Sequence, residues 1–347
     1  MCADTLLEYT EQYNLEGLID YDLEIFEDFS LKQIQENLLS GEGFEVANIV
    51  KKLLLVFSTE IHAYLKMFLM LIVCGFVSSL AMQNQMKNKE VAGCVCYCIF
   101  AGLLCKLYGD ITAPVCEYIE YISVVAKSLF SVLIGITYAK GGAVTGLLMN
   151  SSVMVVINLF LEIFGKILIP LITSSAIVSV ADNFSDRIKI TALATNLRSV
   201  TKWILGFILS LTTGILGVYS MAGTGVDLTI RKAAKMAVGT ALPVVGGVMA
   251  DSMETIGAIL KGVSSVVGVS GLVIIVLYAV VPIVKLLVLR WGLKICIIIL
   301  EPISAREIIN VSENICDCIT SIFAVFASGL LLVCGCTGIL MISGNYI

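Results

Sequence analysis

The chain has 347 residues, of which 58% are hydrophobic and 14% charged, and its mean hydropathy is +0.98. This composition leaves too little polar surface to cover a soluble globule of that size, so it excludes an ordinary soluble domain and predicts an all-α, polytopic helical membrane protein. The formal net charge is −5, yet residues 1–45 hold twelve acidic residues against Lys32 alone, which leaves a basic body behind an acidic start.

Residues 1–60 form the first predicted unit, an acidic head whose apolar positions recur in part at helical spacing. Residues 61–347 form the second unit, the helical membrane domain. The first residues lack the positive and apolar regions of a secretory signal peptide, and the lysines near the first span lie on both sides of it. The sequence therefore leaves open whether a signal peptide is missing and on which side of the membrane the head lies.

The membrane domain begins with a predicted hairpin of two spans, at residues 64–82 and 91–107, joined by a polar turn. Gly109 and Pro114 then favour a break in the helix before a further apolar segment at residues 115–139. Because that segment opens with several charges, its first half is expected at the interface or against protein.

Another span is predicted at residues 143–161, and Glu162 and Lys166, four residues apart, are expected to pair on one helical face. The region 165–180 is expected to be an interrupted segment, since a proline stands between apolar residues and a run of small polar ones. Its marking residues are Pro170, Thr173 and Ser174.

The central stretch, residues 239–262, is apolar enough to enter a bilayer, but a proline, paired glycines and two acids interrupt it. A bend here would leave backbone groups that lipid cannot satisfy, so the stretch is expected to be a broken helix beside protein or water. A purely structural kink remains the alternative. The residues expected to line a site or passage are Pro243, Gly246, Gly247, Asp251 and Glu254.

Basic residues interleaved with apolar ones flank a clear span predicted at residues 203–221. This pattern favours contacts with lipid headgroups or partner proteins, while a solvated connection is equally consistent with it. The residues concerned are Arg187, Lys189, Arg231, Lys232 and Lys235.

The last third of the chain predicts two apolar segments, at residues 266–284 and 286–300. An amphipathic helix at residues 304–320 and a final span at residues 321–342 follow. Together these elements predict six to eight membrane crossings.

Catalytic and metal-binding motifs are weak. Residues 268–271 read GVSG, which matches the serine motif of rhomboid-type proteases, but the single histidine, His62, lies before the first span and not on a later one. Most of the twelve cysteines lie in apolar runs, and the alternating cysteines at 94–98 cannot direct three thiolates to one metal from a helix. We therefore expect no enzyme activity, no cofactor and no metal.

Residues 229–235 (TIRKAAK), residues 243–247 (PVVGG) and Asp251 resemble the hallmark segment of the stage III sporulation protein AE family of endospore-forming bacteria. The resemblance implies an integral protein of the mother-cell membrane that engulfs the forespore, the outer forespore membrane. It also implies partnership with other membrane proteins of a channel complex linking the two cells. The resemblance offers no catalytic residues.

The leading interpretation is thus a platform or conduit subunit that contacts membrane proteins and lipids and binds no nucleic acid. The alternative is an autonomous, cation-coupled transporter in which Asp251 and Glu254 handle the coupling cation. The sequence leaves open its oligomeric state, including self-association, and any cargo.

Overall fold

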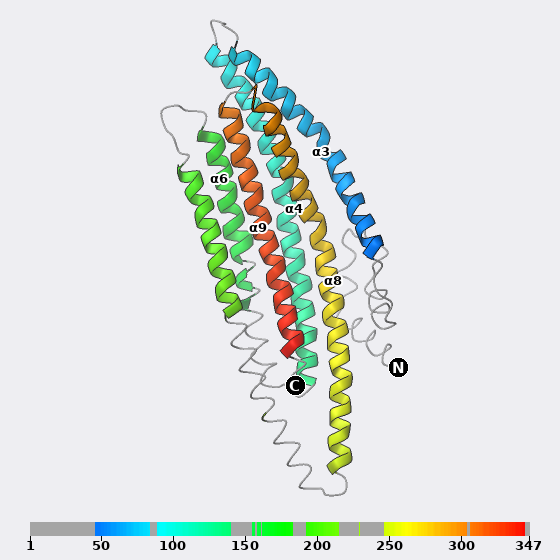
Figure 1. The fold of residues 1–347 in the computed structure, drawn as a ribbon. Coiled ribbons are helices and arrows are strands. Elements are labelled where there is room, and N and C mark those ends of the chain that lie inside the picture. The colour runs from blue at the N-terminus through cyan, green and yellow to red at the C-terminus, as the bar shows by residue number, and fades with distance from the viewer. Residues whose placement is uncertain are drawn as a thin grey trace.

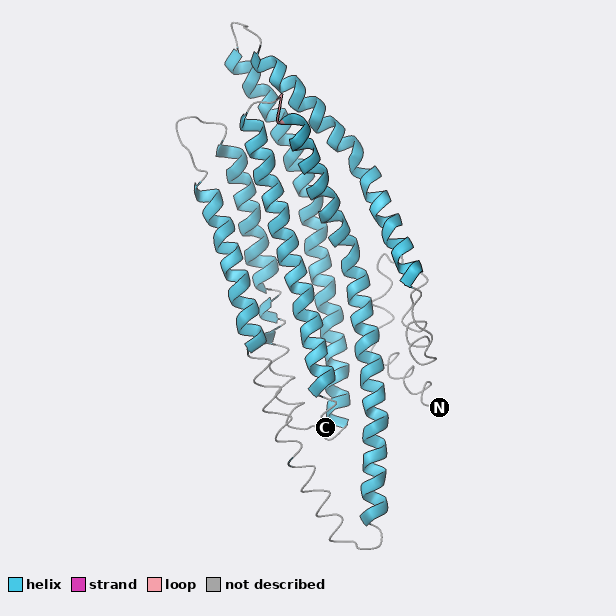
Figure 2. Cartoon of the chain, viewed as in Figure 1, coloured by secondary structure: helices cyan, strands magenta, loops and turns pink. Residues whose placement is uncertain are grey.

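The computed structural model of the chain describes residues 46–83, 89–139, 155–156, 158–160, 162–182, 192–214, 229, 246–303 and 306–343. Every regular element among these residues is helical, as Figure 2 shows. The principal helices are α3 (Val46–Gln83), α4 (Lys89–Ala139), α6 (Ile169–Ala181), α8 (Gly246–Leu300) and α9 (Arg306–Ser343), with a π-helical turn, η2, at Phe164–Leu168 before α6. Residues 192–214 form a further helical stretch.

The helices lie side by side along one long axis, as Figure 1 shows. Helix α8 is central, because it packs against α3, α4 and α9. Helix α6 packs against α9. The stretch 192–214 lies beside α6, on the side of the bundle away from α3 (Figure 1). The core between them is filled by large side chains that are almost fully buried, among them Phe100, Phe130, Phe164 and Leu133.

Two helices are much longer than a bilayer is thick. At 1.5 Å per residue, the 51 residues of α4 extend about 76 Å and the 55 residues of α8 about 82 Å, against about 30 Å for a hydrocarbon core. Five segments among the described residues are long and apolar enough to cross a membrane. This confirms the prediction of an all-α polytopic protein, although the number within the described ranges is below the six to eight expected.

The helix break expected between residues 107 and 115 is wrong. Helix α4 continues through Gly109 and Pro114, and α8 likewise continues through Pro282, joining the two apolar segments expected at 266–284 and 286–300. A proline removes one backbone hydrogen bond from a helix. Buried side chains hold the helix on both sides of Pro114, for example Ile111 and Val115, so packing outweighs that loss.

The two expected interruptions differ in what the structure describes of them. Helix α8 starts at Gly246 and runs unbroken past residue 262, so a break in the central stretch would have to lie before Gly246, where Pro243 is outside the described residues. Near residues 165–180 the chain stays helical, and the irregularity is the turn η2 leading into Pro170. A wider turn just before a proline eases the clash of its ring with the preceding turn.

Close helix contacts depend on glycine. A Cβ atom at Gly292 in α8 would collide with the ring of Phe68 in α3, and one at Gly271 would collide with Leu129 in α4. The backbone of α8 therefore approaches both neighbours more closely than a larger residue allows. Because these glycines set the spacing of three long helices, they fix the shape of the bundle.

Candidate functional site

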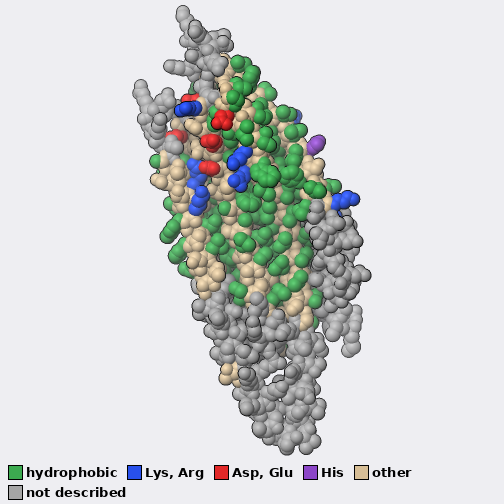
Figure 3. Space-filling view, viewed as in Figure 1, with side chains coloured by type: hydrophobic (Ala, Val, Ile, Leu, Met, Phe, Trp, Pro, Cys, Tyr) green, Lys and Arg blue, Asp and Glu red, His purple; other side chains and the backbone are tan. Residues whose placement is uncertain are grey.

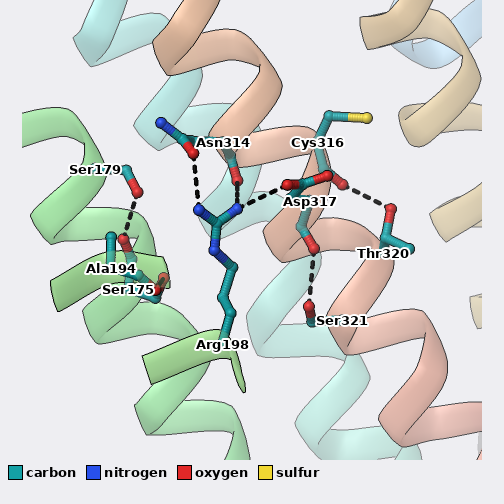
Figure 4. Close-up of polar contacts among 9 residues, drawn as sticks. All are labelled: Ser175, Ser179, Ala194, Arg198, Asn314, Cys316, Asp317, Thr320 and Ser321. Carbon is teal, nitrogen blue, oxygen red and sulfur yellow. Dashed lines mark hydrogen bonds and ion pairs between the residues drawn. The ribbon is translucent and has the colours of Figure 1, made fainter. Parts of the chain in front are cut away.

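A polar cluster joins three helices. Arg198, in the stretch 192–214, extends toward α9, where its Nη1 donates to Asp317 Oδ2 at 2.9 Å and its Nη2 donates to Asn314 Oδ1 at 2.8 Å (Figure 4). On the opposite side, Ser175 of α6 donates to the carbonyl of Ala194 at 2.9 Å. The stretch 192–214 is thus bonded to both α6 and α9 within one helical turn.

The two charged residues of this cluster, Arg198 and Asp317, differ in how far their side chains are buried. The side chain of Arg198 is 9% exposed, whereas that of Asp317 is 71% exposed. A buried guanidinium is costly unless an anion and hydrogen-bond acceptors surround it. Asp317 supplies the charge from the accessible side and Asn314 supplies a further acceptor, so the cation can stay buried between the helices.

Helix α9 also contacts α8 at this depth of the bundle. The thiol of Cys316, next to Asp317, donates to the carbonyl of Arg290 at 3.8 Å. The Nε atom of Arg290 is buried without a hydrogen-bond partner among the described residues. Arg198 and Arg290 therefore lie at about the same depth on two sides of α9.

A second ion pair joins α3 to α8. Lys285 Nζ lies 3.9 Å from Glu60 Oε1, and the two side chains are 23% and 17% exposed. The separation is at the long limit for an ion pair. Because the pair is partly buried, salt screens its attraction less than it screens that of a surface pair. This pair and the contact of Phe68 with Gly292 attach α3 to the central helix.

The residues that mark the second interrupted segment face different surroundings. Thr173 lies against α4, where its hydroxyl is 3.3 Å from that of Tyr108, while it also donates to Ile169 O. Ser174 is exposed and donates to the carbonyl of Pro170 in its own helix. Only Thr173 therefore takes part in a contact between helices, and the role of all three residues in a passage stays a prediction.

The residues of the first interrupted segment are only partly described. Gly246, Gly247, Asp251 and Glu254 lie in the first turns of α8, of which the structure describes the backbone alone. Pro243 and the five basic residues expected to contact partners or headgroups lie outside the described residues. Those basic residues are Arg187, Lys189, Arg231, Lys232 and Lys235.

The predicted pair of Glu162 and Lys166 is confirmed. The carboxylate and ammonium groups are 2.9 Å apart, and the two side chains are 71% and 74% exposed. Solvent screens an exposed pair of this kind, so its net contribution is small. It marks an outward face of the bundle and adds little to its stability.

The geometry gives no support to serine or metal chemistry. Ser270 is buried and donates to Val267 O at 3.1 Å in its own helix, whereas His62 is exposed on α3. Within the described ranges no group of three His, Cys, Asp or Glu residues could hold a metal ion. An apolar cavity between α4, η2 and α9 measures about 20 Å³, room for about one water.

Sequence reasoning missed the cluster around Arg198. Asp317 stood in the amphipathic helix predicted at residues 304–320, but its partner Arg198 is 119 positions away. Helical periodicity relates neighbours three or four residues apart and says nothing about a partner so distant. The only sequence signal is that both are charged residues beside strongly apolar segments, which implies a partner without naming it.

Comparison with known proteins gives one consistent result. Residues 29–344 match the family described as Stage III sporulation protein AE. The chain is also 25% identical over 262 residues to a Bacillus subtilis (strain 168) protein named "Stage III sporulation protein AE", a match that covers 76% of this chain. The same match spans 66% of that relative, just under two thirds of its length. No solved structure matches the chain.

Proposed function

The chain belongs to the stage III sporulation protein AE family, and we propose that it is a non-enzymatic membrane subunit of a complex that links mother cell and forespore. In this role it acts as a platform or conduit in the mother-cell membrane that engulfs the forespore. Its partners are other membrane proteins of the same complex and the surrounding lipids. Self-association is compatible with this role.

The observation that carries the proposal is the length of the central helices. Helix α8 extends about 82 Å and packs along α3, α4 and α9, so the bundle is more than twice as long as a hydrocarbon core is thick. A rigid bundle of this length anchors in one membrane and presents the remainder of its surface outside it. Such a shape suits a subunit that positions other proteins.

The contacts of the described residues suit a role as a platform. Ser270 donates to Val267 O within its own helix. Some polar contacts among the described residues join helices to each other, as Arg198 does with Asp317 and Ser175 with Ala194. These contacts stabilise an arrangement of helices, which is what a platform requires.

Complementation tests the proposal. In an endospore-forming bacterium that lacks its own family member, a tagged copy of the chain should restore spore formation and co-isolate with membrane proteins made during sporulation. The double variant Pro243→Leu/Gly246→Leu should insert into the membrane normally and fail to restore spores. Spore formation without any co-isolated membrane protein would contradict a role as a subunit.

A further inference from the structure

The first half of α9 carries a polar face. Arg306, Asn310, Glu313 and Asp317 follow one another at intervals of four, three and four residues, so they lie along one side of the helix. All four are exposed. We call these four residues the polar face of α9.

Contacts with α8 fix the depth of this face in the bundle. Cys316 bonds to the carbonyl of Arg290, and α9 starts just after α8 ends, so residues 306–317 run back alongside the last ten residues of α8. Helix α3 reaches the same depth, since a Cβ at Gly75 would lie 2.7 Å from Leu300. The ends of α3 and α8 and the start of α9 are therefore level with one another.

At that depth, the outer surface of α3 is apolar, and that of α8 is apolar apart from Lys294, which is exposed and lies close to Cys316 of α9. Figure 3 shows charged side chains gathered on the upper part of one face and hydrophobic side chains beside them. The surface is thus divided by side of the bundle and not only by height. The exposed apolar residues at this depth are Leu69, Met70, Val73, Ile295, Ile298 and Ile299.

A single surrounding medium cannot suit both sides. If water surrounded the bundle at this depth, it would contact a dense apolar surface on α3. Only 28% of the most apolar segment of α3 is buried inside the bundle, against 50% for the corresponding segments of α8 and α9. Lipid around the whole level would contact Glu313 and Asp317, at a cost of about 3 kcal/mol for each charge near the bilayer centre. The two sides therefore require different surroundings.

The neighbouring cations strengthen this division. Arg198 is bonded to Asp317 from the inside, and Lys202, four residues further along the same helix, is exposed. Charged residues at membrane depth usually face a protein interior or a water-filled cavity. Exposed positive and negative side chains that lie beside one another are more stable in contact with water than in contact with hydrocarbon.

We infer that the polar face of α9 lines a water-filled passage at membrane depth, while the apolar side formed by α3 and α8 faces lipid. The passage would hold water and hydrated polar solutes, and other protein chains would supply its opposite wall. Because it assigns a wall of the conduit, this inference rests on the proposed function, although the accessibility that it predicts is measured independently.

Thiol labelling in isolated, unsealed membranes from sporulating cells tests the inference. In a full-length chain without native cysteines, Asn310→Cys and Glu313→Cys place thiols on the polar face, and Ile295→Cys and Ile299→Cys place matched thiols on the apolar side. A membrane-impermeant maleimide should label the first pair at least about tenfold faster, because thiols react as accessible, hydrated thiolates. The buried variant Val311→Cys should label only after denaturation.

Two results would overturn the inference. Equally slow labelling of both pairs would mean that lipid or protein covers the polar face. Equally fast labelling would mean that this depth of the bundle lies outside the bilayer. If the cysteine-free chain does not accumulate, a water-soluble carbodiimide and an amine applied to the unaltered chain should modify Glu313 faster than Glu60, whose side chain is 17% exposed. Equal modification would contradict the inference.

The labelling result separates this inference from the proposed function. Fast labelling of the polar face in a protein that co-isolates with no partner would leave the aqueous face standing and contradict the subunit role. Slow labelling in a protein that co-isolates and restores spores would support a platform and remove the passage.

Discussion

The guanidinium of Arg198 lies 2.9 Å from the carboxylate of Asp317, a residue 119 positions further along the sequence. This contact joins the stretch 192–214 to α9. The arginine is buried and the aspartate is exposed, so the pair holds a cation inside the bundle by means of an anion at its surface. Together with the bond from Ser175 to Ala194, the pair attaches the stretch 192–214 to both α6 and α9.

Replacing Asp317 by asparagine should lower the free energy of unfolding by about 1.5 to 3 kcal/mol, because a buried cation then loses its charged acceptor. The thermal midpoint of the purified protein in detergent measures the loss. Glu313→Gln, one turn away on the same exposed face, should stay within about 0.5 kcal/mol. The exchange Arg198→Asp/Asp317→Arg should recover part of the stability. Equal midpoints for Asp317→Asn and Glu313→Gln would show that the pair is dispensable.

Gly292→Val should separate α3 from α8, because the added side chain collides with the ring of Phe68. Gly102→Val is a matched control, since nothing lies within 4 Å of a Cβ at that position. The first variant should aggregate or elute earlier in size-exclusion chromatography, whereas the second should behave as the parent. Adding Phe68→Ala to Gly292→Val should restore part of the yield. Similar behaviour of the two valine variants would contradict the close approach.

Lys285→Met should destabilise the protein by about 1 to 2 kcal/mol, because it removes the cation that lies 3.9 Å from the partly buried carboxylate of Glu60. The double variant Lys285→Met/Glu60→Leu should be more stable than Lys285→Met, since it removes the orphaned charge. Thermal unfolding monitored by intrinsic fluorescence checks both. Additive losses in the double variant would mean that the two residues do not interact.

Ser270→Ala should leave spore formation unchanged, because this buried hydroxyl bonds only to Val267 O among the described atoms. Gly271→Val, one residue further, should abolish it through the collision with Leu129. Spore counts after complementation give both results. Loss of spores in a stably folded Ser270→Ala variant would reopen the case for a serine nucleophile.

Hydropathy was sufficient to predict the class of fold. The four-residue spacing of opposite charges was sufficient to predict the exposed pair of Glu162 and Lys166, because such a pair depends on residues close in sequence. The continuity of α4 through Pro114 was not predictable in this way, since burial of Ile111 and Val115 against other helices decides it. The partnership of Arg198 and Asp317 likewise depends on how distant helices pack. Local sequence predicts which segments are helical, and tertiary contacts decide where they end and which charges meet.

We propose that this protein works as a subunit and not as a transporter by itself. The most direct measurement is flux of ions and small polar solutes across vesicles that contain only the purified chain, under an imposed cation gradient. We expect no gradient-dependent uptake, and unchanged behaviour when Asp251 and Glu254 are replaced by amides. Uptake that depends on the cation gradient and disappears in Asp251→Asn/Glu254→Gln would contradict it.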